Sequence, residues 1–216
     1  MTLPYQKPIM SLPTKSKYDT HFLDKQSKHP RPSPTVPSPT FSVLGHAIIN
    51  APPAAVYDAL LDLPNYRNWN TFIPGAKLKK TSPEANPETT HMHTGAVFEF
   101  TVKMKETSDS LTTSTELCTL AEPLRTSTPE DPFPVTTATW VYDVSGIPLL
   151  KHLIWSEHVN EIIDLGDGRT EYVHWESFGG VLATFIKWFA SDDLARSFRN
   201  WPEELKGYVE GKQRQS

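Results

Sequence analysis

The stretch TEYVHWESFGG, residues 170–180, holds the side chains best suited to chemistry. Strand-like alternation places His174 and Glu176 on one face and Val173 and Trp175 on the other. Imidazole titrates near neutral pH and burial raises the pKa of a carboxyl group, so the pair could divide base and acid duties. The structural alternative is that Glu176 accepts a hydrogen bond from the turn that follows while His174 fills a polar gap.

A third titratable group comes from the strand before this one. The GDG sequence at 166–168 is typical of a tight hairpin, because glycine tolerates the positive φ angles of such turns. In-register pairing about Asp167 places His158 opposite Glu176, since the two are equally far from the turn. The sequence therefore predicts that His158, His174 and Glu176 converge at one place.

The elements that must position these residues can be read from hydrophobic periodicity. A strand is expected in TFSVLGHAIIN, followed by a helix in NAPPAAVYDALLDL with Asn50 as N-cap and Pro53 in its first turn. The stretch PNYRNWNTFIPG should form a short helical or irregular turn. Six further strands are predicted, at 76–82, 95–105, 111–121, 136–144, 154–164 and 169–178.

The chain should end in a long amphipathic helix. Ser191 is the expected N-cap, and an apolar stripe recurs at helical spacing through Leu194, Phe198, Trp201, Leu205 and Tyr208. Pro202 lies inside this helix and should kink or divide it near Phe198. Seven antiparallel strands with helices on one side predict an α+β layer fold.

Several motifs, in this order, resemble the START-like or SRPBCC superfamily, most closely its polyketide cyclase/dehydrase and coenzyme-Q-binding type. They are INAPPAAVYDALLDLPNYRNWNTFIPGA, Trp140, SGIPLL, His158, and the H-x-E-x-F-x-G-x-L pattern of His174, Glu176, Phe178, Gly180 and Leu182. The resemblance runs from about residue 41 to 210. The chain departs from it at Pro202, where relatives often have Asn, and in a Pro-rich insertion between residues 122 and 135.

The resemblance implies a helix-grip fold, in which a curved seven-stranded antiparallel sheet wraps around the C-terminal helix and encloses an apolar cavity. Members of the superfamily bind hydrophobic small molecules there. The family's H-x-E-x-F register suggests that the face with His174 and Glu176 looks toward the long helix, and His174, Glu176 and His158 are the catalytic candidates. The expected ligand-binding residues are Tyr172, Tyr142, Trp140, Phe98, Phe100, Trp69, Phe185, Phe198 and Trp201.

Composition restricts the class of protein further. The 216 residues carry a net charge of −4, which gives no general attraction for nucleic acid, and no apolar run is long enough to cross a membrane. The single Cys118 allows no internal disulfide and is expected to be a buried, inert thiol in a cytoplasmic protein. His91 and His93 have a chelating spacing but no third ligand nearby, so we expect a surface pair and no metal. Nucleotide, dinucleotide and G-x-S-x-G hydrolase motifs are absent from the sequence.

The first 39 residues hold eight of the twenty prolines, which predicts a disordered, polyproline-like arm that buries little, before a domain at 40–211.

Two functions remain open. One is a cofactor-free enzyme that cyclises or dehydrates a hydrophobic, oxygenated small molecule by acid–base catalysis. The alternative is a non-catalytic binder or carrier of a lipid, quinone or similar ligand. An interaction module recruited through the arm is a third reading, and the oligomeric state stays open.

Overall fold

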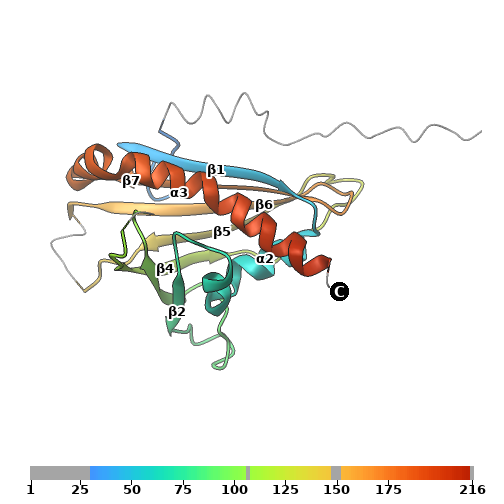
Figure 1. Ribbon diagram of the computed structural model, residues 1–216. Helices are drawn as coiled ribbons and strands as arrows, with labels where there is room; N and C mark the ends of the chain where they lie inside the picture. Colours follow the sequence, from blue (N-terminus) through green and yellow to red (C-terminus); the bar gives the residue numbers. More distant parts are fainter. Residues whose placement is uncertain (1–29, 106–107, 147–151, 215–216) are drawn as a thin grey trace, which may run out of the picture.

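The computed structural model describes residues 30–105, 108–146 and 152–214 (Figure 1). The strands are β1 (Phe41–Ile49), β2 (Gly75–Lys80), β3 (Val97–Val102), β4 (Thr112–Ala121), β5 (Val135–Tyr142), β6 (Trp155–Asp164) and β7 (Thr170–Gly179). The helices are α2 (Pro53–Leu61), the 3₁₀ helix η1 (Leu63–Asn68) and α3 (Val181–Gln213). All seven predicted strands and both predicted helices are present, with most boundaries shifted by a few residues and an earlier start for α3.

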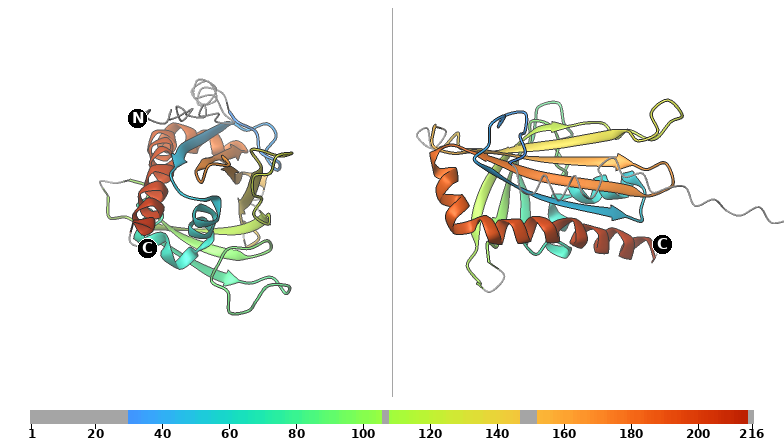
Figure 2. Two further views of the ribbon diagram at one scale, coloured as in Figure 1. Left: turned by 90° about the vertical axis from the view of Figure 1, so that its right-hand side faces the viewer. Right: turned by 90° about the horizontal axis from the view of Figure 1, so that it is seen from above.

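The strands form one antiparallel sheet in the order β1-β7-β6-β5-β4-β3-β2. The sheet curves around α3, which runs along its concave face and packs most closely on β1 (Figures 1 and 2). The predicted α+β helix-grip fold is therefore confirmed.

The start of α2 differs from the prediction in one respect. Its N-cap position is Pro52, without a side-chain capping bond, although Pro53 does occupy the first turn. Asn50 instead donates from its backbone N–H and from Nδ2 to Oε1 of Glu210, at 2.8 and 2.9 Å. Asn50 therefore ties the end of β1 to the end of α3 and does not cap α2.

The last helix is longer than expected, because the apolar stretch VLATFIKWFA is its first part. Ser191 lies inside α3, and the N-cap position is Gly180, at a φ of 94° that glycine adopts without strain. Pro202 does not divide the helix. Figure 2 shows instead that α3 bends in its N-terminal part, so that this part closes over one end of the sheet.

Residues from the end of the predicted disordered arm pack on the outer face of the sheet. Val36 is 1% exposed, and Thr35 donates from its backbone N–H and from Oγ1 to the buried carboxylate of Glu157, at 2.7 and 2.9 Å. Arg31 places its guanidinium 3.7 Å from the centre of the Trp175 ring. Residues 1–29 of the predicted arm lie outside the described part of the chain.

The physical reason is the composition of that outer face. It carries an apolar cluster of Val159, Ile163, Leu165, Val173 and Trp175, which water would otherwise contact. Phe133, from the Pro-rich connection between β4 and β5, packs against the same cluster. Residues 30–39 are therefore part of the folded domain, and the prediction that they bury little was wrong.

Candidate active site

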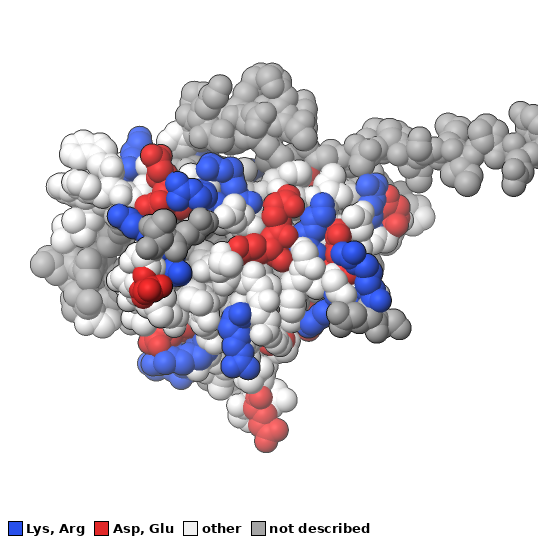
Figure 3. Space-filling view, viewed as in Figure 1, with Lys and Arg blue, Asp and Glu red and all other residues white. Residues whose placement is uncertain are grey.

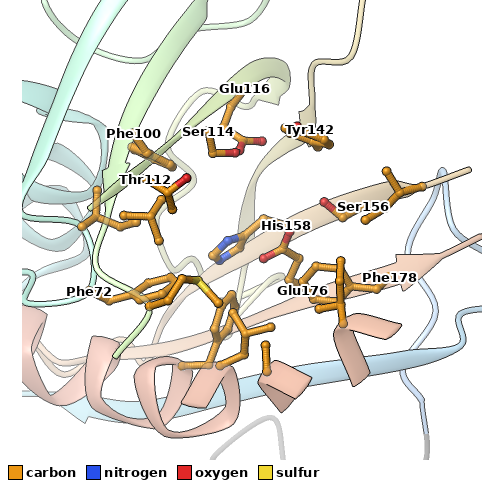
Figure 4. A pocket seen from close by; sticks show the side chains of 18 of the residues that line it. Phe72, Phe100, Thr112, Ser114, Glu116, Tyr142, Ser156, His158, Glu176 and Phe178 are labelled. Atoms are coloured by element: carbon orange, nitrogen blue, oxygen red, sulfur yellow. The ribbon is translucent and has the colours of Figure 1, made fainter. Parts of the chain in front are cut away.

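A cavity of about 490 Å³ lies between the concave face of the sheet and α3. Most of its wall is apolar, and polar side chains gather on the sheet side (Figure 4). The polar groups come from three strands and from the end of β5: Thr112, Ser114, Glu116, Tyr142, Ser156, His158 and Glu176. A concave, mostly apolar space with a few convergent polar groups is typical of small-molecule sites.

The predicted hairpin register is confirmed. His158 pairs with Glu176 across β6 and β7, and both side chains line the cavity (Figure 4). The predicted faces are also confirmed, because Phe178 packs with the α3 residue Phe198 while Trp175 belongs to the outer cluster. Strand alternation and hairpin symmetry were enough to find this part of the site.

Two carboxyl groups in the cavity have raised pKa values. Burial raises the pKa of Glu176 to about 7, against the opposing effect of the Ser156 hydroxyl. Burial raises the pKa of Glu116 to about 8, and the negative charge of Glu176 adds to that rise. The Ser114 hydroxyl donates to Oε1 of Glu116 and partly offsets it. At pH 7 the site therefore holds one mainly neutral acid and one carboxyl group near its titration midpoint.

Glu116 was missed by the reasoning from sequence. A signal was present, since Glu116 and the buried Cys118 share a face of β4 in the run STELCTL. An acidic residue on an inward strand face is uncommon unless it is paired or functional. Burial raises the pKa of Cys118 to about 12, so the thiol is not a nucleophile at neutral pH.

His174 lies behind the cavity wall and is not among the residues that line it. It is fully buried, and its Nε2 lies 2.9 Å from the backbone carbonyl oxygen of Phe198 in α3. Its Nδ1 lies 2.9 Å from Nε2 of His158. Burial lowers the pKa of His174 to about 3 and that of His158 well below its usual range, so both rings are neutral. The predicted group of three thus consists of two residues at the cavity and one that supports them.

The aromatic residues predicted to bind ligand divide in a similar way. Six of them line the cavity: Trp140, Tyr142, Phe100, Phe185, Phe198 and Trp201. Tyr172, Phe98 and Trp69 do not line it and lie in the adjoining core instead. The Tyr172 hydroxyl donates to Oδ1 of Asn160 at 2.7 Å, which satisfies it inside the protein. Alternation identifies the inward face but not how far along a strand the cavity extends.

One end of the cavity is lined by the N-terminal part of α3. Phe185 both lines the cavity and is 51% exposed, and Trp188 and Phe189 beside it are 71% and 79% exposed. On the face of the molecule drawn in Figure 3, basic and acidic side chains are interspersed and form no stripe of one sign. Within the part of the chain that the structure describes, no helix is long and apolar enough to cross a membrane.

The two histidines with chelating spacing form other contacts. Nε2 of His91 lies 3.3 Å from Oδ1 of Asp58, and Nε2 of His93 lies 3.0 Å from Oγ1 of Thr81. Among the residues that the structure describes, no three His, Cys, Asp or Glu side chains are grouped in a way that could hold a metal ion.

Comparison with known proteins identifies the fold. The architecture, with its cavity between sheet and helix, defines an α+β helix-grip protein. Solved structures with the same arrangement include a hypothetical protein of Helicobacter pylori, with a TM-score of 0.56, 13% identity, and coverage of 78% of this chain and 87% of the other. Another is a STAR-related lipid transfer protein fragment of Xanthomonas axonopodis, with a TM-score of 0.52, 12% identity, and coverage of 77% and 84%. The chain therefore has the START-like (SRPBCC) fold.

One curated relative is similar over most of the chain. It is the oxopyrrolidines biosynthesis cluster protein O of Penicillium oxalicum, which is 25% identical over 179 residues, covering 78% of this chain and 86% of the relative. No protein-family model matches the chain.

Proposed function

We propose that this protein is an enzyme that binds a hydrophobic, oxygenated small molecule in the cavity and catalyses its cyclisation or dehydration by acid–base chemistry, using its own side chains. The observation that carries the proposal is the pair of carboxyl groups, Glu116 and Glu176, in one largely apolar cavity. Groups whose environments hold them in different protonation states at one pH are suited to act as acid and base.

Each carboxyl group has a role that follows from its pKa. Glu176 is the general base, because about half of it is ionised at pH 7, and it removes a proton from the carbon next to a substrate carbonyl. Glu116 is the general acid, because it is mainly protonated, and it donates its proton to the departing hydroxyl group, which leaves as water. The substrate thus loses one water, and a proton exchanged with solvent restores both carboxyl groups.

The apolar wall of the cavity contributes to catalysis by holding the substrate in position. A chain folded against the aromatic residues of the wall is held near its reactive conformation, which lowers the entropic part of the barrier. The relative from Penicillium oxalicum is named for a biosynthesis cluster, and a role in making a small molecule agrees with that name.

Proton removal can be tested without the natural substrate. We expect the protein to speed the incorporation of deuterium from D₂O at the α-carbon of 1-tetralone, followed by NMR, above the rate in buffer alone. Glu176→Gln should lower the protein-dependent rate by about 10²–10⁴-fold, since the variant keeps the shape but not the base. Equal rates for the wild type and Glu176→Gln would refute the assignment of the base.

The runner-up function is a carrier that binds an apolar ligand without changing it. The dominance of apolar side chains in the cavity wall favours it. Mass spectrometry of small molecules released from the purified, denatured protein distinguishes the two functions. An unmodified lipid or quinone at near one-to-one occupancy, together with no α-proton exchange, would support the carrier.

A further inference from the structure

The two buried histidines have a protonation pattern that the surrounding backbone determines. A carbonyl oxygen can only accept a hydrogen bond, so the 2.9 Å contact with Phe198 requires the proton of His174 to be on Nε2. Because the ring is neutral, Nδ1 of His174 is then an acceptor. Nε2 of His158, 2.9 Å away, must be the donor, and this leaves Nδ1 of His158 without a proton.

Pro202 explains why the Phe198 carbonyl is available for this contact. In an uninterrupted helix, the carbonyl of Phe198 would accept from the backbone N–H four residues later. That residue is Pro202, which has no N–H. His174 supplies the missing donor, and its fully buried ring stacks on the Phe198 ring with centroids 4.8 Å apart.

Gly45 on β1 permits the close approach of helix and strand. It pairs with His174 across β1 and β7, and a Cβ atom added to Gly45 would lie 1.9 Å from the Phe198 carbonyl oxygen and 2.6 Å from Nε2 of His174. The three residues Gly45, His174 and Pro202 therefore form one unit that fixes the hydrogen-bond direction at the cavity wall.

We propose that this unit holds His158 as a hydrogen-bond acceptor, through Nδ1, and that the cavity thereby selects ligands carrying a hydroxyl group, as in a phenol or an enol, against their methyl ethers. This inference rests on the proposed function, since it concerns the same cavity, and it identifies hydroxyl-bearing compounds as the substrate class. His174 is a positioning residue, since it acts on the ligand only through His158. An ether in the same place leaves the acceptor of His158, a buried side chain, without a donor, which is costly.

The ligand selection is tested by equilibrium binding of two matched probes, 2-naphthol and 2-methoxynaphthalene, to the full chain at pH 6. We expect the naphthol to bind about tenfold or more tightly than the ether. His158→Phe keeps an aromatic ring but removes the acceptor, so it should bring the two affinities together. Glu176→Gln retains a carbonyl acceptor and should keep the preference. An absent preference in the wild type, or one lost in Glu176→Gln and kept in His158→Phe, would overturn the proposal.

The protonation pattern is tested on the wild type, independently of ligand and catalysis. ¹⁵N NMR of the imidazole side chains should show a proton on Nε2 and none on Nδ1 in both His158 and His174, unchanged from pH 9 to pH 5.5. Assignment follows from the signals lost in His158→Phe or, if that variant fails to fold, from through-bond correlations to the backbone. A proton on Nδ1 of His158 would overturn the proposal even if the Glu116 and Glu176 assignments hold.

Discussion

Replacing Glu116 by glutamine should make the stability of the protein less sensitive to alkaline pH. The carboxyl group is 7% exposed, and its pKa rises from 4.5 to about 8 on folding. A group with a raised folded pKa stabilises the fold fully below its unfolded pKa and loses that contribution as pH rises through the folded value. The affected window runs from pH 4.5 to about 8. Glutamine resembles the neutral acid at every pH in that window.

The size of the effect follows from the interval between the two pKa values. Each pH unit inside it is worth about 1.4 kcal/mol, so ionisation of Glu116 should cost the wild type about 3 kcal/mol between pH 6 and pH 9. For a domain of this size that corresponds to a melting temperature lower by roughly 6–12 °C. Glu116→Gln should be spared this fall, since the amide cannot ionise.

Thermal unfolding of the wild type and Glu116→Gln, measured at intervals from pH 6 to pH 9, provides the assay. Contributions from His158 and His174, which destabilise the fold as pH drops below 6.5 because only the unfolded chain takes up their protons, are common to both proteins and cancel. Ser110→Ala, at an exposed position before β4, serves as a matched control and should follow the wild type. Parallel curves for the wild type and Glu116→Gln would show that Glu116 ionises freely and is no general acid at pH 7.

Three further predictions concern packing. Trp201→Ala should cost about 3–5 kcal/mol in chemical denaturation, because this buried ring contacts both the core and the cavity, while the exposed Glu203→Ala should change little. Val36→Ala should lower the free energy of unfolding by about 1–3 kcal/mol, because it removes two buried methyl groups. The exposed Ser38→Ala is the control and should change it very little. Equal values for the two variants would mean that residues 30–39 bury little. Gly45→Ala should reduce the yield of folded protein or its melting temperature sharply, because the added methyl group overlaps the α3 backbone, and a normal melting curve would contradict that close approach.

The sequence was sufficient to predict strands that bury one face, because their hydrophobic residues alternate, and hairpins with a glycine-rich turn. The inward alternation of β3 and the hairpin about Asp167 gave correct strands, and the hairpin also gave the His158–Glu176 register. Both cases depend on local chemistry, namely the alternation of a strand and the turn preferences of glycine.

Features that depend on long-range contacts could not be predicted in this way. β6 and β7 are buried almost throughout, because residues 30–39 and the β4–β5 connection cover their outer side. The hydrophobic periodicity of a strand does not show which distant segments cover it. Glu116 was missed because its raised pKa comes first from burial under elements distant in sequence, and second from the charge of Glu176, which is three strands away in the sheet. Asn50 was misassigned because its partner, Glu210, comes from the other end of the chain.

The strand order has a consequence for how the protein is made. Among the residues that the structure describes, β1 is the first strand, yet its pairing partner is β7, the last, and α3 packs against both. During synthesis, β1 therefore has no strand partner until β7, which ends at Gly179, has left the ribosome, and its backbone N–H and C=O groups lack their native strand partners for most of translation. Such long-range closure makes folding slow and exposes strand edges to aggregation. Expression at lower temperature, or with chaperones that shield nascent strands, should therefore raise the folded yield.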